Sequence, residues 1–253
     1  MKAFKILKAL GDAEGWLSGC ELSRRANLPQ ASGYRLIQTM EELGAIAKGK
    51  RGQFRPGMLL LSISRSVPVL ELLRNASEPI LTHLAESLAL TAHLAVLENG
   101  VVTYIGKYSS VDAFPLHTRV GSQLEAYSSG VGKILFGGLN RAEVETFVMD
   151  GQLVAPTPFT ITSPRRLREE LAVVRKRGFA TDDRKSHIEI RCVAVPVRDN
   201  CGKTIAAISA SDEASRMTPS REAKIKQALF EATAGLQNAL YRCRPVRDSV
   251  RQA

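Results

Sequence analysis

The spacing of the apolar residues changes near Thr91, and this change limits most strongly what the chain can fold into. Before Thr91, apart from a hairpin at residues 45–55, the apolar residues recur at intervals of three and four, which is typical of amphipathic helices. From Thr91 onward several segments alternate between apolar and polar residues, which is typical of half-buried strands. We therefore expect a helical first part and a second part in which a sheet carries helices.

The alternating segments predict a largely antiparallel sheet, and the fold class is α+β. Asn99 and Gly100 form a two-residue hairpin turn between the first two strands. The expected strands are 91–97, 101–107, 113–120, 191–197 and 203–210, and the expected helices of this part are 77–88, 130–136, 141–149, 164–177 (capped by Thr162 or Ser163) and 218–241.

Positive charge is concentrated at the two ends of the chain. The formal net charge is +10 over 253 residues. Residues 1–66 hold 11 Lys and Arg against 5 Asp and Glu, whereas residues 67–241 hold 20 against 19. The last twelve residues add 4 Arg and 1 Asp. A small basic unit beside a nearly neutral body indicates a nucleic-acid-binding domain attached to a second domain.

Three short helices with a tight turn between the second and third are expected at the start of the chain. Residues 3–10 form the first helix, and a capping box of Ser18 and Glu21 opens the second. The third begins near Pro29 and ends at Gly44. Its apolar face carries Gly33, Leu36, Ile37, Met40 and Leu43. A glycine inside a helix costs about 1 kcal/mol relative to alanine, so Gly33 indicates a close approach of the backbone either to DNA or to the second helix.

The opposite face of the third helix is rich in groups that hydrogen-bond to bases, because Gln and Arg match adenine and guanine edges in the major groove. A basic hairpin of residues 45–48 and 53–55 follows and would rest on phosphates as a wing. The pattern predicts a winged helix-turn-helix on double-stranded DNA. The predicted DNA-binding residues are Gln30, Ala31, Ser32, Tyr34, Arg35 and Gln38 in the helix and Lys48, Lys50, Arg51 and Arg55 in the wing.

The chain is expected to divide into four segments. Residues 1–56 form the winged helix-turn-helix, 57–76 a linker helix, 77–241 the second domain, and 242–253 a basic disordered tail. The linker is unusually apolar at residues 59–61 and 63, which predicts contact with a second copy of the chain rather than with solvent. A dimer would place two recognition helices on one duplex.

The stretch SSGVGKIL, residues 128–135, contains part of a phosphate-loop pattern. A Walker loop needs a glycine five places before its Gly-Lys pair and a Ser or Thr after it. Tyr127 and Ile134 stand at these places, so no nucleotide site is expected. Two interpretations remain, a helix start whose free amides hold a small anion and a tight turn that begins a core helix.

The four cysteines form no CxxC pair, which predicts reduced thiols with neither a zinc site nor a disulfide framework. Lys5 and Lys8 interrupt the apolar start that a secretory signal needs. No apolar run approaches the roughly 20 residues that span a bilayer. We expect a cytoplasmic protein without a cofactor, a metal or a membrane contact.

The chain resembles the IclR family of bacterial transcription regulators over nearly its whole length. The similar segments are LSRRANLPQASGYRLIQTMEELG with the basic wing, and then HLAVLENGVVTYIGK, RVGSQLEAYSSGVGKIL, GFATDDRKSHIEIRCVAVPVRD and IAAISAS. The resemblance implies a winged helix-turn-helix joined by a linker helix to a GAF-like domain that binds a small organic effector. It also implies dimers, or dimers of dimers, on pseudo-palindromic operators.

The resemblance further implies the residues of the effector site. The family pocket uses the glycine-led helix start, an aspartate and a cysteine ten residues apart, and a Ser-x-Ser at a strand end. In this sequence these are Gly130, Val131, Asp182, Cys192, Ser209 and Ser211, with Leu116, Leu124 and Ile190 as apolar walls. The amides of the helix start would bind the carboxylate or another polar end of the effector.

Two departures from the family bear on the effector. Arg184, Lys185 and His187 follow Asp182 and Asp183 where many relatives stay acidic, which favours a cationic rim and an acidic effector. Tyr127 lies near the place of a histidine that is frequent in the family, which favours an aromatic or bulkier ligand.

Two other functions remain open from the residues alone. Asp182, His187 and Cys192 place an acid, a base and a thiol close in sequence, as a cysteine-dependent hydrolase of small acids would need. Cys192 lies in an apolar strand, however, where cysteine usually acts as a small hydrophobe. The winged helix is alternatively a protein-interaction module, which would not need Arg35 and the wing cations on one surface. The favoured hypothesis is an effector-controlled repressor or activator, and not an enzyme.

Overall fold

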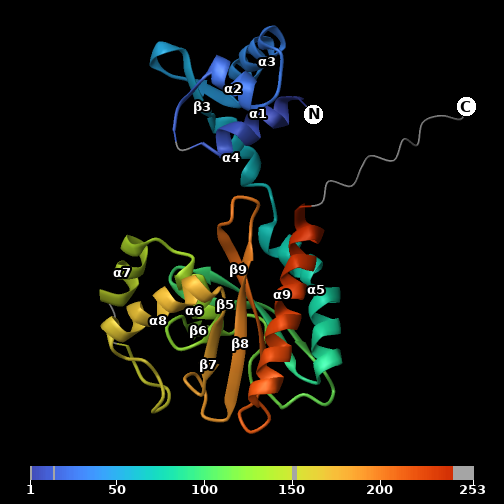
Figure 1. Cartoon of the computed structure of the whole chain (residues 1–253), viewed down its shortest axis with the longest axis vertical. Coiled ribbons are helices and arrows are strands. Elements are labelled where there is room, and N and C mark those ends of the chain that lie inside the picture. Colours follow the sequence, from blue (N-terminus) through green and yellow to red (C-terminus); the bar gives the residue numbers. More distant parts are fainter. Residues whose placement is uncertain (1, 14, 150–152, 242–253) are drawn as a thin grey trace, which may run out of the picture. The chain divides into compact units, whose positions relative to one another are not determined.

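The computed structural model describes residues 2–13, 15–149 and 153–241 of the chain. The expected tail, 242–253, lies outside the described residues. The chain divides into two compact units, Met1–Val69 and Leu70–Ala253 (Figure 1). Among the described helices, none has both the length and the apolar character that a membrane span requires.

The described part of the first unit contains four α-helices, one short 3-10 helix (Lys50–Gly52) and a small sheet. Its helices are α1 (Lys2–Gly11), α2 (Gly19–Arg25) and α3 (Gln30–Glu42), and its strands are β1 (Leu17–Ser18), β2 (Ile46–Lys48) and β3 (Gln53–Pro56), followed by α4 (Met58–Ser64). The antiparallel sheet has the order β1-β3-β2. Ser18 caps α2, since its Oγ accepts a hydrogen bond from the Glu21 amide at 3.2 Å. The winged helix-turn-helix is therefore confirmed as a fold.

Helix α3 packs against α2 so closely that Gly33 leaves no room for a side chain. A Cβ at position 33 would lie 2.8 Å from the Ser23 Cβ and closer still to its Oγ. Ser23 is itself buried, and its hydroxyl donates to the Gly19 carbonyl at 2.9 Å. The close approach at Gly33 is thus to the second helix. Leu43, expected on the buried face, is 64% exposed because α3 ends at Glu42 and Leu43 lies beyond its packed part.

The second unit is built on one six-stranded sheet. Its strands are β4 (Thr91–Glu98), β5 (Val101–Ser109), β6 (Gln123–Glu125), β7 (Ala180–Asp183), β8 (Ile190–Arg198) and β9 (Thr204–Glu213). They follow the order β6-β5-β4-β9-β8-β7, and every pair is antiparallel. Asn99 and Gly100 both have positive φ in the β4–β5 turn, as expected of a two-residue hairpin.

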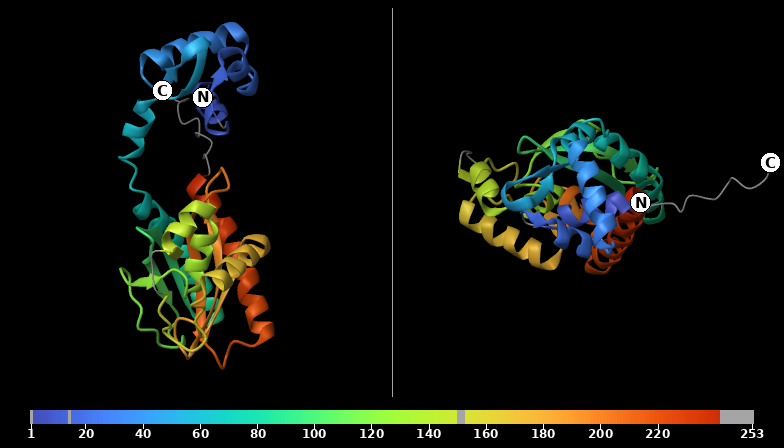
Figure 2. Two further views of the ribbon diagram at one scale, coloured as in Figure 1. Left: turned by 90° about the vertical axis from the view of Figure 1, so that its left-hand side faces the viewer. Right: turned by 90° about the horizontal axis from the view of Figure 1, so that it is seen from above.

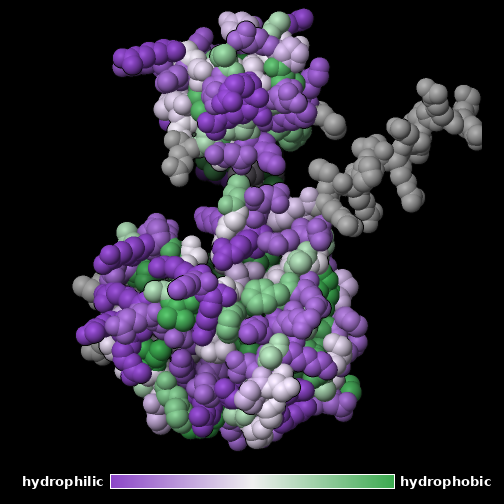
Figure 3. Space-filling model, viewed as in Figure 1, coloured by the Kyte–Doolittle hydropathy of each residue, from purple (hydrophilic) through white to green (hydrophobic). Residues whose placement is uncertain are grey.

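Helices cover both faces of this sheet (Figures 1 and 2). They are α5 (Val69–Leu88), α6 (Gly130–Gly137), α7 (Arg141–Met149), α8 (Pro164–Arg177, capped by Ser163) and α9 (Pro219–Tyr241). The α5–α9 layer packs on a core that includes Val193 and Val195, whereas the α6–α8 layer packs on a core that includes Ala194. Successive residues of β8 thus point to opposite faces. The outer surface shown in Figure 3 is mainly hydrophilic, with apolar side chains in small patches.

Two expected elements differ from the structure. Residues 113–120 form no strand, because the carbonyl groups of Leu116 and Thr118 accept hydrogen bonds from Lys107 Nζ instead of a strand partner. The edge position beside β5 belongs to β6. The helix expected to begin at Ser77 begins at Val69, with Pro79 inside it, because the buried Leu73 and Leu81 hold both halves on the sheet. The strands β1, β6 and β7 were not predicted from the sequence.

We expect Gly33→Ala to destabilise the first unit by about 1 to 3 kcal/mol, because overpacking at Ser23 outweighs the gain in helix propensity. The single tryptophan, Trp16, lies in this unit, so its fluorescence during urea unfolding reports on this unit. Gly11→Ala is the matched control, since a Cβ at Gly11 would meet nothing within 4 Å. Equal unfolding midpoints for both variants would contradict the packing argument.

Candidate nucleic-acid interface and ligand cavity

The predicted DNA-binding residues lie on one unit and are mostly exposed. In α3, Tyr34 is 58% exposed and Ser32 is half-buried. The remaining predicted residues are all exposed: Gln30, Ala31, Arg35 and Gln38 in the helix and Lys48, Lys50, Arg51 and Arg55 in the wing. Polar and basic groups are thus free to contact a partner, as base readout and phosphate contact both require.

Helix α3 and the wing share an open hollow of about 580 Å³. Gln30, Tyr34 and Lys48 line it together with the exposed Cys20, whose Sγ accepts a hydrogen bond from Gln30 Nε2 at 3.1 Å. At the base of the wing the Arg55 guanidinium lies over the Trp16 ring, 4.7 Å from its centroid. This contact gives Arg55 a fixed position while leaving it exposed.

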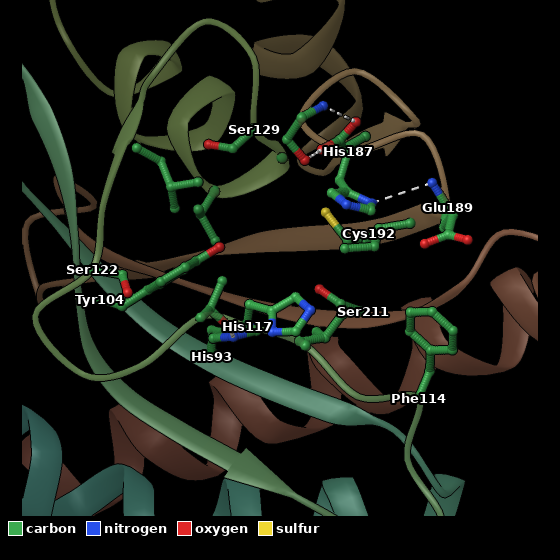
Figure 4. A pocket seen from close by; sticks show the side chains of 18 of the residues that line it. His93, Tyr104, Phe114, His117, Ser122, Ser129, His187, Glu189, Cys192 and Ser211 are labelled. Atoms are coloured by element: carbon green, nitrogen blue, oxygen red, sulfur yellow. Dashed lines mark hydrogen bonds between the residues drawn. The ribbon is translucent and has the colours of Figure 1, made fainter. Parts of the chain in front are cut away.

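The second unit contains a cavity of about 510 Å³ between the sheet and the start of α6 (Figure 4). Nearly all residues implied for the effector site come together around it. They are Leu116, Leu124, Gly130, Val131, Asp182, Ile190, Cys192 and Ser211. Ser209 does not line the cavity. It is buried two register pairs away from Ser211 on β9, between His93 and Ala194.

Both glycines at the start of α6 are needed for the helix to lie where it does. A Cβ at Gly130 would be 2.8 Å from the Cys192 Sγ, and one at Gly132 would overlap the Ala126 backbone. Ser129 caps the helix by accepting from the Gly132 amide at 3.1 Å. The first turn therefore faces the cavity with the amide end of a helix, where an anion is stabilised.

Asp182 shapes the cavity wall. Its carboxylate accepts from the Lys185 amide at 2.7 Å and also from the Ser186 hydroxyl. Burial raises the pKa of Asp182. These bonds fix the turn between β7 and β8, which brings Ser186, His187 and Glu189 to the cavity.

His93 and Tyr104 line the cavity and were not anticipated. Their rings stack at a centroid distance of 4.3 Å, and His93 Nε2 lies 2.8 Å from the Thr118 hydroxyl. Burial, with the charge of Lys107, lowers the pKa of His93 to about 3, so the ring is neutral near pH 7. One signal was available: His93 shares the alternating face of β4 with Ala95, which packs toward α6.

Most of the other lining groups escaped prediction because they come from segments without regular structure, although Gln123 belongs to β6 and His187 was expected at the rim. Lys107 Nζ donates to the Leu116 and Thr118 carbonyls at 2.8 and 2.7 Å, which holds the covering segment on β5. The additional lining residues are Phe114, Pro115, His117, Thr118, Ser122, Gln123, Ser129, Ser186, His187 and Glu189.

The charges expected at the rim are mostly paired. Arg184 Nε lies 3.0 Å from Asp183, and Lys185 Nζ lies 3.7 Å from Glu170. Of the three basic residues that follow Asp183, only His187 lines the cavity, beside the acidic Glu189. Tyr127 lies outside the lining, with its hydroxyl donating to the Val154 carbonyl at 2.9 Å.

Cys192 lies beside the start of α6, but its thiol is not activated as a nucleophile. Burial raises the pKa of its thiol to about 12, so it is protonated near pH 7. His187 is exposed, and its Nδ1 accepts from the Glu189 amide at 3.3 Å. Within the described part of the chain, no three His, Cys, Asp or Glu side chains gather as metal ligands.

Domains of known protein families match both units of the chain. Residues 1–49 match the IclR helix-turn-helix domain, and residues 67–237 match the domain described as "Bacterial transcriptional regulator IclR C-terminal". The regulator KdgR of Escherichia coli K12 is 31% identical over 223 residues, covering 87% of this chain and 84% of its own. The E. coli K12 repressor IclR is 28% identical, covering 91% and 85%.

Solved structures give the same result. The IclR structure from Thermotoga maritima is 28% identical with a TM-score of 0.64, covering 94% of this chain and 97% of its own. An IclR homologue from Microbacterium hydrocarbonoxydans in complex with 4-hydroxybenzoate is 25% identical with a TM-score of 0.63 and the same coverage. With a winged helix-turn-helix in one unit and a lined cavity in the other, the chain belongs to the IclR family of DNA-binding transcription regulators.

Proposed function

We propose that this regulator changes its affinity for an operator when a small organic carboxylate, aromatic acids included, binds in the cavity of the second unit. The observation that carries the proposal is the start of α6, where Gly130 and Val131 face a cavity that is otherwise largely apolar. Amides at a helix start favour an anionic group, and apolar walls supply most of the affinity.

The walls favour a flat, apolar body attached to that anionic group. Leu116, Leu124 and Ile190 supply aliphatic surface, and Tyr104 and Phe114 supply aromatic surface. A volume of about 510 Å³ suits a ligand larger than acetate. The relative bound to 4-hydroxybenzoate supports an aromatic acid, and the proposal extends that ligand class to this chain.

The DNA contacts of the proposal are those of α3 and the wing. Arg35 and Gln38 would read bases, and Lys48, Lys50 and Arg51 would contact phosphates. A regulator bound to the chromosome of a bacterium works in the cytoplasm. Catalysis through Cys192 is not proposed, because its thiol is buried and protonated.

A homodimer, or a dimer of dimers, is part of the proposal. Helix α4 exposes Met58 at 73%, Leu61 at 45% and Ile63 at 55%. A short helix that exposes this much apolar side-chain surface is typical of a segment that contacts a second chain. Two copies would present two recognition helices to a pseudo-palindromic operator.

Arg35→Ala should weaken operator binding by about 1 to 3 kcal/mol, because a base contact is lost. The measurement is fluorescence anisotropy at fixed salt on a duplex selected by the wild-type protein from random sequence. Arg165→Ala, at an exposed position on α8, is the control and should leave operator affinity unchanged. Unchanged binding by the Arg35 variant would favour the protein-interaction module instead.

Leu116→Ala should weaken the binding of 4-hydroxybenzoate or benzoate by about 1 to 2 kcal/mol, since part of an apolar wall is removed. Calorimetric titration measures the change in ligand affinity. The affinity for DNA in the absence of ligand should be the same in the variant and in wild type. Leu139→Ala is the matched control, because Leu139 is likewise a half-buried leucine of this unit but does not line the cavity. An equal loss in both variants would mean that the change acts through the fold rather than through the wall.

Leu61→Glu should raise the dissociation constant of the dimer at least about tenfold, because a charge is buried in an apolar contact. Sedimentation velocity over a concentration series measures it. Ser62→Glu, an exposed neighbour on α4, should leave self-association intact. Wild-type association in the Leu61 variant would place the interface elsewhere.

A further inference from the structure

Lys133, the lysine of SSGVGKIL, is fully buried in the α6 layer, and neither the fold nor the proposed ligand contacts account for its charge. Its exposed fraction is 0%, and it is among the largest completely buried side chains of the described residues. Lys133 lies on α6 two residues after Val131, which lines the cavity. A buried ammonium group is costly to desolvate, so its presence here requires a physical reason.

The ammonium group of Lys133 lies behind the cavity wall. Nζ donates to the carbonyl of Thr181, the residue that precedes Asp182 on β7. It lies 3.6 Å from a Glu170 carboxylate oxygen on α8. Lys133 therefore joins three elements, α6, β7 and α8, and two of them contribute residues to the cavity.

Glu170 does not cancel the charge of Lys133, because it is shared among three cations. The same Glu170 oxygen lies 3.8 Å from Arg177 and 3.7 Å from Lys185. Together with Asp182, the cluster contains three cations and two carboxylates. The other acid nearby, Glu189, is exposed at the mouth and is screened by water.

We infer that Lys133 gives the effector cavity its preference for carboxylates. From behind the cavity wall, its charge keeps the start of α6 electrostatically positive, so that carboxylates bind more tightly than neutral ligands of the same shape. It would act without touching the ligand, by adding to the partial positive charge of the helix start. Its field passes through a buried, low-dielectric layer, where a charge acts more strongly than at the surface. This inference rests on the proposed function of the cavity.

The same arrangement predicts that the affinity of the cavity for carboxylates depends on pH. Burial lowers the pKa of Lys133 to about 8, so the charge is present at pH 7 and is lost as the pH rises through 8. The groups that face Nζ are the Thr181 carbonyl and Asp182 on β7, Glu170 on α8, Cys192 on β8 and Lys185 in the turn after β7. Cys192 stays protonated over this range, because its pKa is raised to about 12.

The test compares carboxylates with their own amides. Acetate, benzoate and 4-hydroxybenzoate, each paired with the corresponding amide, are titrated calorimetrically into full-length wild type and Lys133→Met. Methionine keeps the length and apolar stem of lysine without the charge. We expect carboxylate affinity to fall about tenfold in the variant, with amide affinity within about twofold of wild type. Lys176→Met, an exposed lysine on α8, should leave both affinities unchanged.

The wild-type protein supplies a second measurement that does not depend on the folding of a variant. With acetate and benzoate, and not with 4-hydroxybenzoate, whose phenol ionises as the pH approaches 9, carboxylate affinity should fall about fivefold between pH 7 and pH 9, because binding and protonation of Lys133 are linked. The matching amides are acetamide and benzamide. Amide affinity should stay constant over the same range, and so should carboxylate affinity in a folded Lys133→Met variant.

The outcomes separate the inference from the proposed function. If wild type prefers carboxylates and the variant keeps the same preference, the role of Lys133 is overturned while the cavity remains a carboxylate site. Equal losses for carboxylates and amides would show a purely structural role and also overturn it. If wild type binds no member of the panel at millimolar concentration, the proposed ligand class fails, and the inference fails with it.

Discussion

The close approach of helix α6 to the sheet is the constraint on which the second unit depends. Gly130 lies against Cys192, and Gly132 lies against the backbone at Ala126, so neither position tolerates a Cβ without movement. The sheet offers alanines at 180, 194 and 207 to the same core. Small residues on both sides bring the first turn of the helix to the cavity, where its amides can face a ligand.

In this unit the two faces of the sheet have different roles, because successive side chains of each strand point to opposite faces. On β8, Val193, Val195 and Val197 point to the α5–α9 layer and form a continuous apolar core. Cys192 and Ala194 point to the opposite side, where the layer of α6 and the cavity lies. A sheet with a period of two can therefore bury one face for stability and use the other for a site. Two buried polar groups lie on the second side: Asp182 accepts hydrogen bonds from the turn after β7, and Lys133 Nζ donates to the Thr181 carbonyl.

In the first unit, helix α3 packs through one face and exposes polar side chains on the opposite face. Gly33, Ile37 and Met40 of α3 are buried, whereas Tyr34, Arg35 and Gln38 are exposed. The helical period of 3.6 produces this separation directly from the sequence. Hence the polar face could be predicted residue by residue, and only Leu43, at the end of the helix, was placed on the wrong side.

The sequence by itself determined the periodicity, and with it the fold class, most helices and the residues that share a face. Through its resemblance to the family, the sequence also indicated residues that line the cavity on regular elements, among them Gly130, Cys192 and Ser211. Only the tertiary structure decided which irregular segments meet at the cavity, since loops 110–122 and 184–189 have no period that a sequence can reveal. It also decided that α5 continues through Pro79, because burial of leucines on the sheet outweighs a local helix-breaking residue. The reason is the same in each case: local patterns fix local structure, whereas contacts between distant segments depend on how the whole chain packs.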